Sequence, residues 1–398
     1  MTIGISGPVD LKLLACDLGS ENLPDTNAFP LVSHLINALL KRGYKVIAYT
    51  NSGTITEPLV LHGHNLTVCV ARTKPQPGRR FFRYEINELK NLMQQHPADV
   101  IYAFWTYEYA WSALKSGIPT IVSIHDIARK IFLTQCDMFR FVRLIMNKIV
   151  TTRARHLAAN SSYTYSQLSK SLKKKTVTLN NFFTSDIEDT VTKPEQKENY
   201  IVSVINGFNT RKGVPLALHA FAKVREAFPD VNYHLIGVDM EPDGLAHAYA
   251  KQHNLEQGVK FLGPLVHDNL IQLVANAKVL LHPSREESFG MAVIESMVVG
   301  TPVVGGRESG FIPHLLDHGK AGLLCNVYSA DEVAAAVKKL LSDDAFARDV
   351  AAYAYRFAQD NFSEEVVVKQ HLELYESIIS KYYPQRVRKE TALEEGNF

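Results

Sequence analysis

The chain has 398 residues, of which 46% are hydrophobic and 21% are charged. A single hydrophobic core seldom extends beyond about 250–300 residues, so this length predicts two domains. The 43 Lys and Arg residues nearly balance the 41 Asp and Glu residues, which excludes binding to nucleic acid through bulk positive charge. The four cysteines are far apart and form no CxxC pair, which argues against a zinc site or a disulfide framework.

The start of the chain, MTIGISGPVDLKLLACDLGS, has no apolar segment of the signal-peptide type. No later stretch reaches the ~18 uninterrupted apolar residues that a membrane-spanning helix needs. Together with the cysteines, these features lead us to expect a cytoplasmic protein that is either soluble or peripheral on the inner face of a membrane.

Short β-rich runs alternate with helical patterns through the first half of the chain. We expect strands at 11–16, 45–50, 66–71, 99–104 and 120–126, and helices at 29–44 and 82–96. Strand, helix and strand repeated in this way are typical of a parallel sheet with crossover helices.

The polar segment 184–199 has few core-forming residues, so it is the predicted linker. The alternation then starts again. Strands are expected at 200–207, 232–239, 259–263 and 279–284, and helices at 214–228, 244–254, 267–277 and 291–299. The whole pattern predicts an α/β fold of two Rossmann-like doubly wound domains that face each other across a cleft. A last helix is expected at 363–383, before a loose tail.

The segment SREESFGMAVIESMVVGTPVV, residues 284–304, joins a strand end to a buried helical pattern. A helix beginning after Gly290 would offer free N–H groups and its dipole to a phosphate. Glu287 would precede this helix, and Glu295 would lie in its second turn. A carboxylate can accept hydrogen bonds from two sugar hydroxyls. On spacing alone, however, the two glutamates are equally well explained as a cap and an ordinary helical residue.

The same segment resembles the signature of the retaining GT-B glycosyltransferases of family 4, also called glycosyl transferases group 1. That signature is E-x-F-G-x-x-x-x-E-A/S-M-x-x-G-x-P-V-V, with seven residues between two glutamates. Glu287 and Glu295 have this separation, and Glu286 does not. Residues 260–284 and 304–325 are also similar to the family. The C-terminal half therefore matches closely, and the N-terminal half matches in outline.

The resemblance implies a domain plan and a reaction. Residues 1–190 would form an acceptor-binding domain and residues 191–365 a nucleotide-sugar-binding domain. Residues 366–398 would form a helix that returns to the first domain, followed by the tail. The implied reaction moves a hexose from a nucleotide sugar to a hydroxyl of a glycan, glycolipid or lipid-linked acceptor in polysaccharide or glycoconjugate assembly. It retains the anomeric configuration, and the leaving phosphate would act as the base.

The resemblance also assigns roles around the donor. It implies that Glu287 contacts the donor sugar and that Glu295 holds the ribose of the nucleotide. Backbone amides near Phe289, Gly290 and Met291 would meet the diphosphate or the sugar.

Two cations, Arg211 and Lys212, stand at the start of the expected helix 214–228. Cations there can stabilise the charge of a departing nucleoside diphosphate without a metal. They resemble the Arg and Lys pair of the family, although the family Arg usually lies five residues before the Lys, where this chain has Gly207. Arg211 is therefore either a substitute for that Arg or a solvated residue.

His125 follows the buried strand pattern TIVSI and resembles the family histidine that faces the reacting sugar. It could bond a donor hydroxyl or position the acceptor. A lone histidine at a strand end is more often structural. The chain departs from the family in two places: its N-terminal loop lacks the usual Gly-Gly pair, and His314 replaces an acid, although Gly310 is kept.

No DxD motif is present, so we expect no metal site, and no cofactor apart from the donor substrate. Recognition of the base would rely on backbone groups near Gly263 and Pro264, at the end of the strand 259–263. No side chain distinguishes the bases. UDP is favoured because it is the commonest donor in the family, with GDP as the alternative.

A membrane surface is a further candidate partner. Segments 72–85 and 129–155 carry arginines among aromatic residues, and 170–175 is rich in lysine. A helix of this kind can lie on an anionic membrane or can pack into its domain with its charges in water.

Two other functions compete with transfer. One is a GT-B enzyme of another type, such as an epimerase or phosphorylase, which the intact glutamate motif disfavours. The other is a non-catalytic nucleotide-sugar-binding subunit, which the altered N-terminal loop allows.

Overall fold

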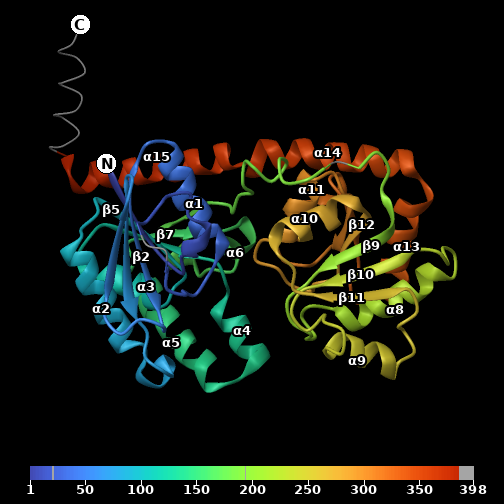
Figure 1. Cartoon of the computed structure of the whole chain (residues 1–398), viewed down its shortest axis with the longest axis horizontal. Helices are drawn as coiled ribbons and strands as arrows, with labels where there is room; N and C mark the ends of the chain where they lie inside the picture. Colours follow the sequence, from blue (N-terminus) through green and yellow to red (C-terminus); the bar gives the residue numbers. More distant parts are fainter. Residues whose placement is uncertain (20–21, 193, 385–398) are drawn as a thin grey trace, which may run out of the picture. The chain divides into compact units, whose positions relative to one another are not determined.

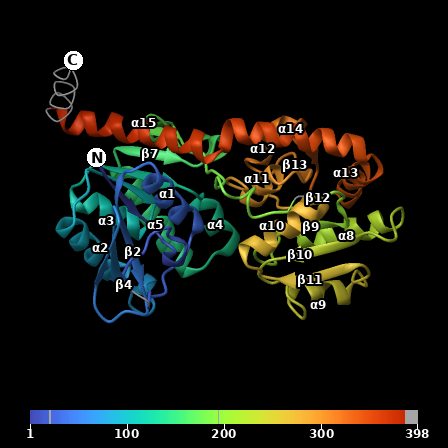
Figure 2. The same ribbon diagram turned by 45° about the horizontal axis from the view of Figure 1, so that its top comes forward.

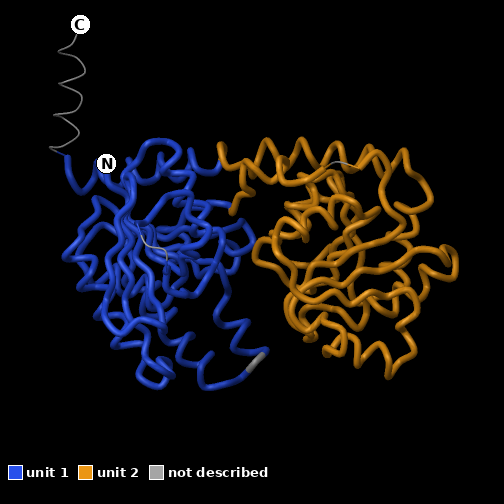
Figure 3. The backbone as a smooth tube through the Cα atoms, in the orientation of Figure 1, with its two compact units in different colours: residues 1–180, 367–398 blue, residues 181–366 orange. Residues whose placement is uncertain are grey.

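The computed structural model describes residues 1–19, 22–192 and 194–384. The chain divides into two compact units, with residues 1–180 and 367–398 in unit 1 and residues 181–366 in unit 2 (Figure 3). The first boundary falls before position 190 because the polar segment is bound to unit 2. Gln272 accepts from the Thr192 amide at 2.8 Å, and the Tyr355 hydroxyl donates to Glu188 at 3.1 Å. The expected loose tail lies outside the described residues.

Unit 1 is built on an eight-stranded sheet with the order β3-β4-β2-β1-β5-β6-β7-β8 (Figure 1). All neighbouring strands are parallel except β3 and β4, which pair antiparallel. The strands are β1 (Thr2–Ser6), β2 (Lys45–Ser52), β3 (Leu59–Gly63), β4 (Leu66–Arg72), β5 (Val100–Phe104), β6 (Thr120–Ile124), β7 (His156–Ala159) and β8 (Thr176–Thr178).

The expected strand at 11–16 was wrong. The first strand is TIGIS, which lies between β2 and β5, with Ile3 and Ile5 fully buried. Gly4 permits this packing, since a Cβ there would lie 2.8 Å from the Ile101 side chain. Residues Leu11–Leu13 form a short 3-10 helix, η1, because the Asp10 side chain accepts from the Lys12 amide and caps it.

The helices of unit 1 confirm both expected helices and add others. They are α1 (Pro30–Lys41), α2 (Arg83–Gln95), α3 (Glu108–Ser116), α4 (Ala128–Gln135), α5 (Met138–Arg153), α6 (Ser162–Ser166) and α7 (Lys170–Lys173), and a 3-10 helix, η2 (Pro77–Arg80), precedes α2. Alternate residues of β5 serve opposite faces of the sheet. Ile101 and Ala103 belong to the core that includes Tyr109 of α3, whereas the Tyr102 and Phe104 rings pack together on the other face.

Unit 2 contains a second parallel sheet, with the order β11-β10-β9-β12-β13-β14. Its strands are β9 (Glu198–Val204), β10 (Asn232–Ile236), β11 (Val259–Gly263), β12 (Ala277–His282), β13 (Val303–Gly306) and β14 (Leu323–Cys325). Its helices are α8 (Val214–Arg225), α9 (Leu245–Gln252), α10 (His267–Asn276), α11 (Met291–Val298), α12 (Ile312–Leu315), α13 (Ala330–Ser342) and α14 (Asp344–Phe362), with a 3-10 helix, η3 (Asp317–Gly319). The predicted strands and helices of this half are confirmed.

The last helix, α15 (Glu364–Tyr382), which Figure 2 shows, belongs to unit 1 from Val367 onward. Its residues Val367, Val368, Tyr375 and Ile378 are buried. His371 is buried, and its ring packs edge-on against Tyr102 with centroids 4.8 Å apart. Tyr375 is fully buried and lies 5.9 Å from the same ring. Unit 1 is therefore completed by a segment from the far end of the sequence. Within the described part of the chain, no helix is long and apolar enough to cross a membrane.

Candidate active site

Glu287 and Lys212 form an ion pair in unit 2, with 2.7 Å between Oε1 and Nζ. Each side chain retains only 15% of its accessible surface. Lys212 precedes α8, which follows β9, and Glu287 precedes α11, which follows β12. Because β9 and β12 are adjacent and parallel, the loops after them meet at one edge of the sheet. The structure therefore brings together two residues of the predicted site that are 75 positions apart.

His282 also faces this carboxylate, with Nε2 3.6 Å from Glu287 Oε1. Burial by itself would raise the pKa of the Glu287 carboxyl. The nearby His282 imidazole and the positive charge of Lys212 outweigh that effect and hold the pKa well below its usual range. Glu287 is therefore an anion at neutral pH, suited to accept hydrogen bonds from hydroxyl groups.

Two glycines permit the close approach of these loops. Gly213, at φ +71°, caps α8, and a Cβ there would lie 2.2 Å from the Pro283 carbonyl oxygen. Gly310, at φ +65°, would place a Cβ 2.1 Å from the Glu287 carbonyl oxygen. The Phe311 amide donates to that same carbonyl at 2.9 Å. Glu287 is thus held by backbone contacts as well as by its ion pair.

Arg211 contacts the backbone of the loop that carries Glu287. Its Nη1 donates to the Glu286 carbonyl at 3.2 Å, and its own carbonyl accepts from the Arg285 amide at 2.8 Å. The structure thus gives Arg211 a bridging position between the two loops. Arg211 is therefore not a fully solvated residue, and its role at the donor site stays a prediction.

The N-terminus of α11 has the form expected for an anion site. Gly290, at φ +111°, is the N-cap residue, and its conformation favours glycine. No described side chain caps the helix. Met291 is half-buried, and its sulfur accepts from the Asn181 amide at 3.8 Å. The Phe289 ring is buried and stacks on Phe311 with centroids 5.2 Å apart, so only its backbone is available to a ligand.

Glu295 lies on α11 and faces the start of α10. His267 Nε2 lies 3.4 Å from Glu295 Oε1, and this contact, with some opposition from burial, raises the pKa of His267. Gly263 and Pro264 stand just before α10, where β11 ends, and Gly263 has φ +66°. The end of β11, the start of α10 and Glu295 therefore lie close together.

His125, from unit 1, is enclosed in a cluster of rings. It stacks on Phe104 with centroids 5.1 Å apart and meets Phe29 edge-on at 5.9 Å. Its Nε2 lies 2.7 Å from Ser123 Oγ, which accepts from the Tyr102 hydroxyl. The contact between His125 Nε2 and Ser123 Oγ suits either tautomer of the ring, because a hydroxyl can both donate and accept.

Burial, with a smaller contribution from His371, lowers the pKa of His125 to about 3, so the ring is neutral at physiological pH. Nδ1 is buried without a hydrogen-bond partner among the described residues. The ring can therefore form one further hydrogen bond through Nδ1, but it cannot act as a cationic acid at neutral pH.

Sequence reasoning missed His282 and His267. His282 is the last residue of the buried strand β12, so the rule that ligands meet the carboxyl ends of parallel strands could have found it. No local pattern pointed to His267. His314, at the position of the usual acid, is exposed and stacks on Phe311 at 5.8 Å. No cluster of three or more potential metal-ligating residues occurs among the residues that the structure describes.

Comparison with known proteins decides the family. Residues 186–357 match the family described as Glycosyl transferases group 1, and residues 31–186 match the one described as Glycosyltransferase Family 4. The two matches adjoin and cover most of the chain. The chain belongs to the group 1 glycosyltransferases. This confirms the expected family and the expected enzyme class.

Individual relatives of this glycosyltransferase are distant. N-acetyl-alpha-D-glucosaminyl L-malate synthase from Bacillus anthracis is 24% identical over 74% of this chain and 78% of the relative. Several further curated relatives are matched over less than half of their own length.

Two solved structures share the whole GT-B fold. Sucrose-phosphate synthase from Thermosynechococcus elongatus superposes with a TM-score of 0.75 and 18% identity, over 96% of this chain and 99% of that one. HepE from Anabaena, solved with UDP-glucose, superposes with a TM-score of 0.70 and 20% identity, over 95% of this chain and 100% of that one. At this identity the likeness shows the fold alone, and it confirms the GT-B prediction.

Proposed function

We propose that this glycosyltransferase moves a hexose from a nucleoside-diphosphate sugar to a hydroxyl of a glycan, glycolipid or lipid-linked acceptor. UDP is the favoured nucleotide and GDP the alternative. The observation that carries the proposal is the buried Lys212–Glu287 pair beside the uncapped N-terminus of α11. A cation, an anion and a positive helix end at one sheet edge match the diphosphate and the sugar hydroxyls of such a donor.

Each group of the site has a role in this proposal. The Gly290 and Met291 amides and the Lys212 ammonium receive the diphosphate, and Glu287 accepts hydrogen bonds from the donor sugar. Glu295 accepts from the ribose hydroxyls, and the backbone at Gly263 and Pro264 meets the base. Arg211 keeps the two loops together. UDP is favoured because the structurally similar HepE was solved with UDP-glucose.

The proposed transfer retains the anomeric configuration. The bond between the anomeric carbon and the phosphate oxygen breaks, and the acceptor oxygen bonds to the same face of the sugar. The acceptor proton passes to the leaving phosphate oxygen, which is the strongest base left at the site. Lys212 stabilises the negative charge that develops on the leaving group. In this scheme the neutral His125 hydrogen-bonds a sugar hydroxyl and moves no proton.

A thermal-shift panel with UDP, GDP, ADP and TDP tests the donor site. A ligand that binds only the native state raises the melting temperature. We expect one nucleotide, most of all UDP, to stabilise the wild-type protein and to lose its effect in Glu295→Ala. The same nucleotide then names the labelled sugar for a transfer assay. If no nucleotide shifts the melting temperature at millimolar concentration, the transfer proposal fails. Binding without transfer to any acceptor would support the non-catalytic subunit instead.

A further inference from the structure

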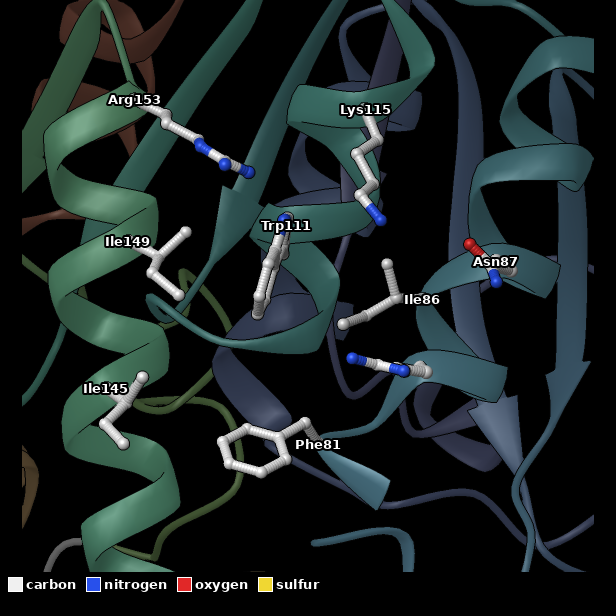
Figure 4. Close-up of a pocket in the computed structure, with 9 residues that line it drawn as sticks. Phe81, Ile86, Asn87, Trp111, Lys115, Ile145, Ile149 and Arg153 are labelled. Carbon is white, nitrogen blue, oxygen red and sulfur yellow. The ribbon is translucent and has the colours of Figure 1, made fainter.

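Unit 1 contains a hollow of about 560 Å³ between α2, α3 and α5, away from the residues discussed above (Figure 4). Its wall is largely apolar. Ile145 and Ile149 face it from successive turns of α5, Ile86 faces it from α2, and the Trp111 ring of α3 stands between them. Phe81, which is 39% exposed, forms the outer edge. A hollow of this size and lining suits a hydrocarbon chain.

Three cations surround this apolar wall. Figure 4 shows Lys115 and Arg153 at the end of the hollow beyond Trp111, and Arg83 also lines it. Lys115 Nζ and Arg153 Cζ lie 5.6 and 6.0 Å from the Trp111 ring centroid. None of the three cations has a carboxylate partner among the described residues. The indole Nε1 of Trp111 is buried and also lacks a hydrogen-bond partner there. The hollow therefore presents donors and positive charge with no anion of its own.

A second hollow of about 590 Å³ adjoins the first and shares Phe81, Arg83 and Asn87 with it. Its other lining residues are mainly basic: Lys74, Arg79 and Arg80. No described acidic side chain forms an ion pair with the charged group of any of these three, although Glu85 accepts from the Lys74 backbone amide at 2.9 Å. Six cations therefore line the two adjoining hollows, in a chain whose total charge is close to neutral.

Large apolar side chains are exposed beside the same hollow. Phe139, at the start of α5, is 42% exposed, and its ring lies 6.2 Å from that of Phe82. Its neighbours Met138 and Phe141 are 74% and 43% exposed. Arg140 and Arg143, which also contact the Phe139 ring, are ion-paired with Asp137 and Glu108. Exposed aromatic and aliphatic groups next to cations are the pattern of a surface that enters the headgroup region of a membrane.

We propose that this face of unit 1 binds an anionic bilayer, and that the hollow takes one anionic phospholipid. The lipid phosphate lies among Arg83, Lys115 and Arg153, and the first part of an acyl chain lies along Ile86, Ile149 and Trp111. Phe139, Met138 and Phe141 enter the interface beside it. The charge of the six cations selects an anionic lipid surface over a zwitterionic one. This site contains none of the residues assigned to donor binding, so it stands or fails independently of the proposed transfer.

Vesicle flotation tests the surface. We expect the full-length protein to float with vesicles that contain phosphatidylglycerol, and not with vesicles of phosphatidylcholine alone. The triple variant Arg83→Glu, Lys115→Glu, Arg153→Glu should lose at least about tenfold in partitioning. The control Lys45→Glu, Lys260→Glu, Lys369→Glu makes the same charge change at exposed positions outside the two hollows and should float like wild type. An equal loss of vesicle partitioning in both triple variants would overturn the site, because binding would then depend only on the net charge of the protein.

Fluorescence tests the hollow itself. The chain has two tryptophans, so Trp105→Phe leaves Trp111 as the only one. We expect brominated acyl chains of phosphatidylglycerol vesicles to quench Trp111, and brominated phosphatidylcholine to leave it unchanged. Flotation without quenching would overturn the lipid site, since the acyl chain of the lipid would then stay outside the hollow. Quenching by monomeric brominated dodecyl phosphate with no flotation would assign the hollow to a free amphiphile and overturn the bilayer as its source.

The nucleotide panel separates this proposal from the preceding one. The charge-reversed variant should lose flotation but keep the nucleotide-induced shift of the melting temperature. A charge-reversed variant that loses both flotation and the nucleotide-induced shift has lost its fold. In that case Ile149→Asp takes its place, provided that its melting temperature is unchanged, and quenching of Trp111 is measured. If Ile149→Asp keeps wild-type quenching, the acyl chain does not occupy the hollow.

Discussion

At the scale of single residues, the site depends on one carboxylate that is shared by two neighbours. Lys212 and His282 both face Oε1 of Glu287, and Glu287 is nearly enclosed. A buried anion that loses its cation is left uncompensated, at a large cost in stability. Lys212 therefore has two tasks in the proposed function: together with His282 it keeps Glu287 ionised, and it stabilises the leaving group.

Replacing Lys212 should separate these tasks. We expect Lys212→Met to lower kcat by about 10²–10³ because a preorganised positive charge is lost from the transition state. Without the ammonium, the pKa of Glu287 should also rise towards its usual range. On acidification Glu287 should then become protonated, and activity should be lost, at a higher pH than in wild type. Lys212→Arg, which keeps the charge, should recover part of the rate. A pH–rate profile of all three proteins measures both effects, and an unchanged kcat in Lys212→Met would contradict the assigned role.

His267 should make nucleotide affinity depend on pH. Its pKa is raised mainly by Glu295, so the pair stabilises the folded free protein below the unfolded pKa of ~6.5. That stabilisation is lost as the pH rises through the higher folded value. Since Glu295 is the proposed ribose ligand, loss of the pair frees it, and nucleotide affinity should increase over this range. Calorimetric titration at several pH values measures the trend, and His267→Asn should flatten it. An equal slope in that variant would exclude His267 as the cause.

At the scale of elements, the position of Glu287 is set by loops that approach closely. The segment between β12 and α11 lies against the start of α12, where Gly310 leaves room for the Glu287 carbonyl. Gly290 and Gly213 adopt positive φ at the starts of α11 and α8. The Glu287 carboxylate thus rests on backbone packing that only glycine allows at these points.

Substitution at Gly310 tests this packing against a matched control. Gly300 has φ +72°, close to that of Gly310, but a Cβ at Gly300 would meet nothing within 4 Å. Both Gly→Ala variants should pay about 1 kcal/mol for the backbone conformation. Gly310→Ala should also displace the Glu287 loop, with a larger drop in melting temperature and at least a tenfold loss of kcat/KM, about 1.4 kcal/mol. Equal behaviour of the two variants would show that the close contact is unimportant.

At the scale of the whole molecule, the two ends of the chain build one unit. Residues from Val367 to Ile378 of α15 contribute fully buried side chains to unit 1. Tyr375 is the largest of these, and it packs on Tyr102 and His371. We expect Tyr375→Ala to destabilise the protein by about 3–5 kcal/mol, the usual range for removing a large buried ring. Tyr383→Ala, at a 38% exposed position directly after α15, should change stability by less than about 0.5 kcal/mol. Denaturant unfolding compares the two, and similar losses would refute the packing role of α15.

Buried histidines should also make the molecule sensitive to acid. Burial lowers the pKa of His125 and of His371 to about 3, and that of His234 to about 4. Each histidine stays neutral in the folded state while the unfolded chain takes up a proton below pH ~6.5. Their stabilisation is therefore complete above pH ~6.5 and is lost as the pH falls towards the folded values, by about 1.4 kcal/mol per pH unit for each group.

Unfolding measured from pH ~7 to ~4 should show this slope, and His371→Phe should reduce it by one proton. A slope unchanged by that substitution would mean that His371 is already protonated in the folded protein.

The fold was largely predictable because its signals are local. Apolar alternation and helical spacing predicted β2, β5 and α8 from their own residues. The first strand was missed because TIGIS is short and contains glycine, whereas LKLLAC has more apolar residues. What made the strand was its central place between β2 and β5, where Gly4 allows close packing. The segment 129–155 was read as one amphipathic stretch, but Asp137 caps a new helix and divides it.

The sequence by itself determined the two rounds of strand and helix, and the spacing of Glu287 and Glu295 across the start of one helix. Both follow from the backbone periods of strands and helices, which residues near in sequence reveal. Only the tertiary structure decided that Lys212 and His282 share the Glu287 carboxylate, that His125 is enclosed by Phe29 and Phe104, and that α15 completes unit 1. These contacts join residues far apart in sequence, and they depend on the order of strands in a sheet and on which loops its edge brings together.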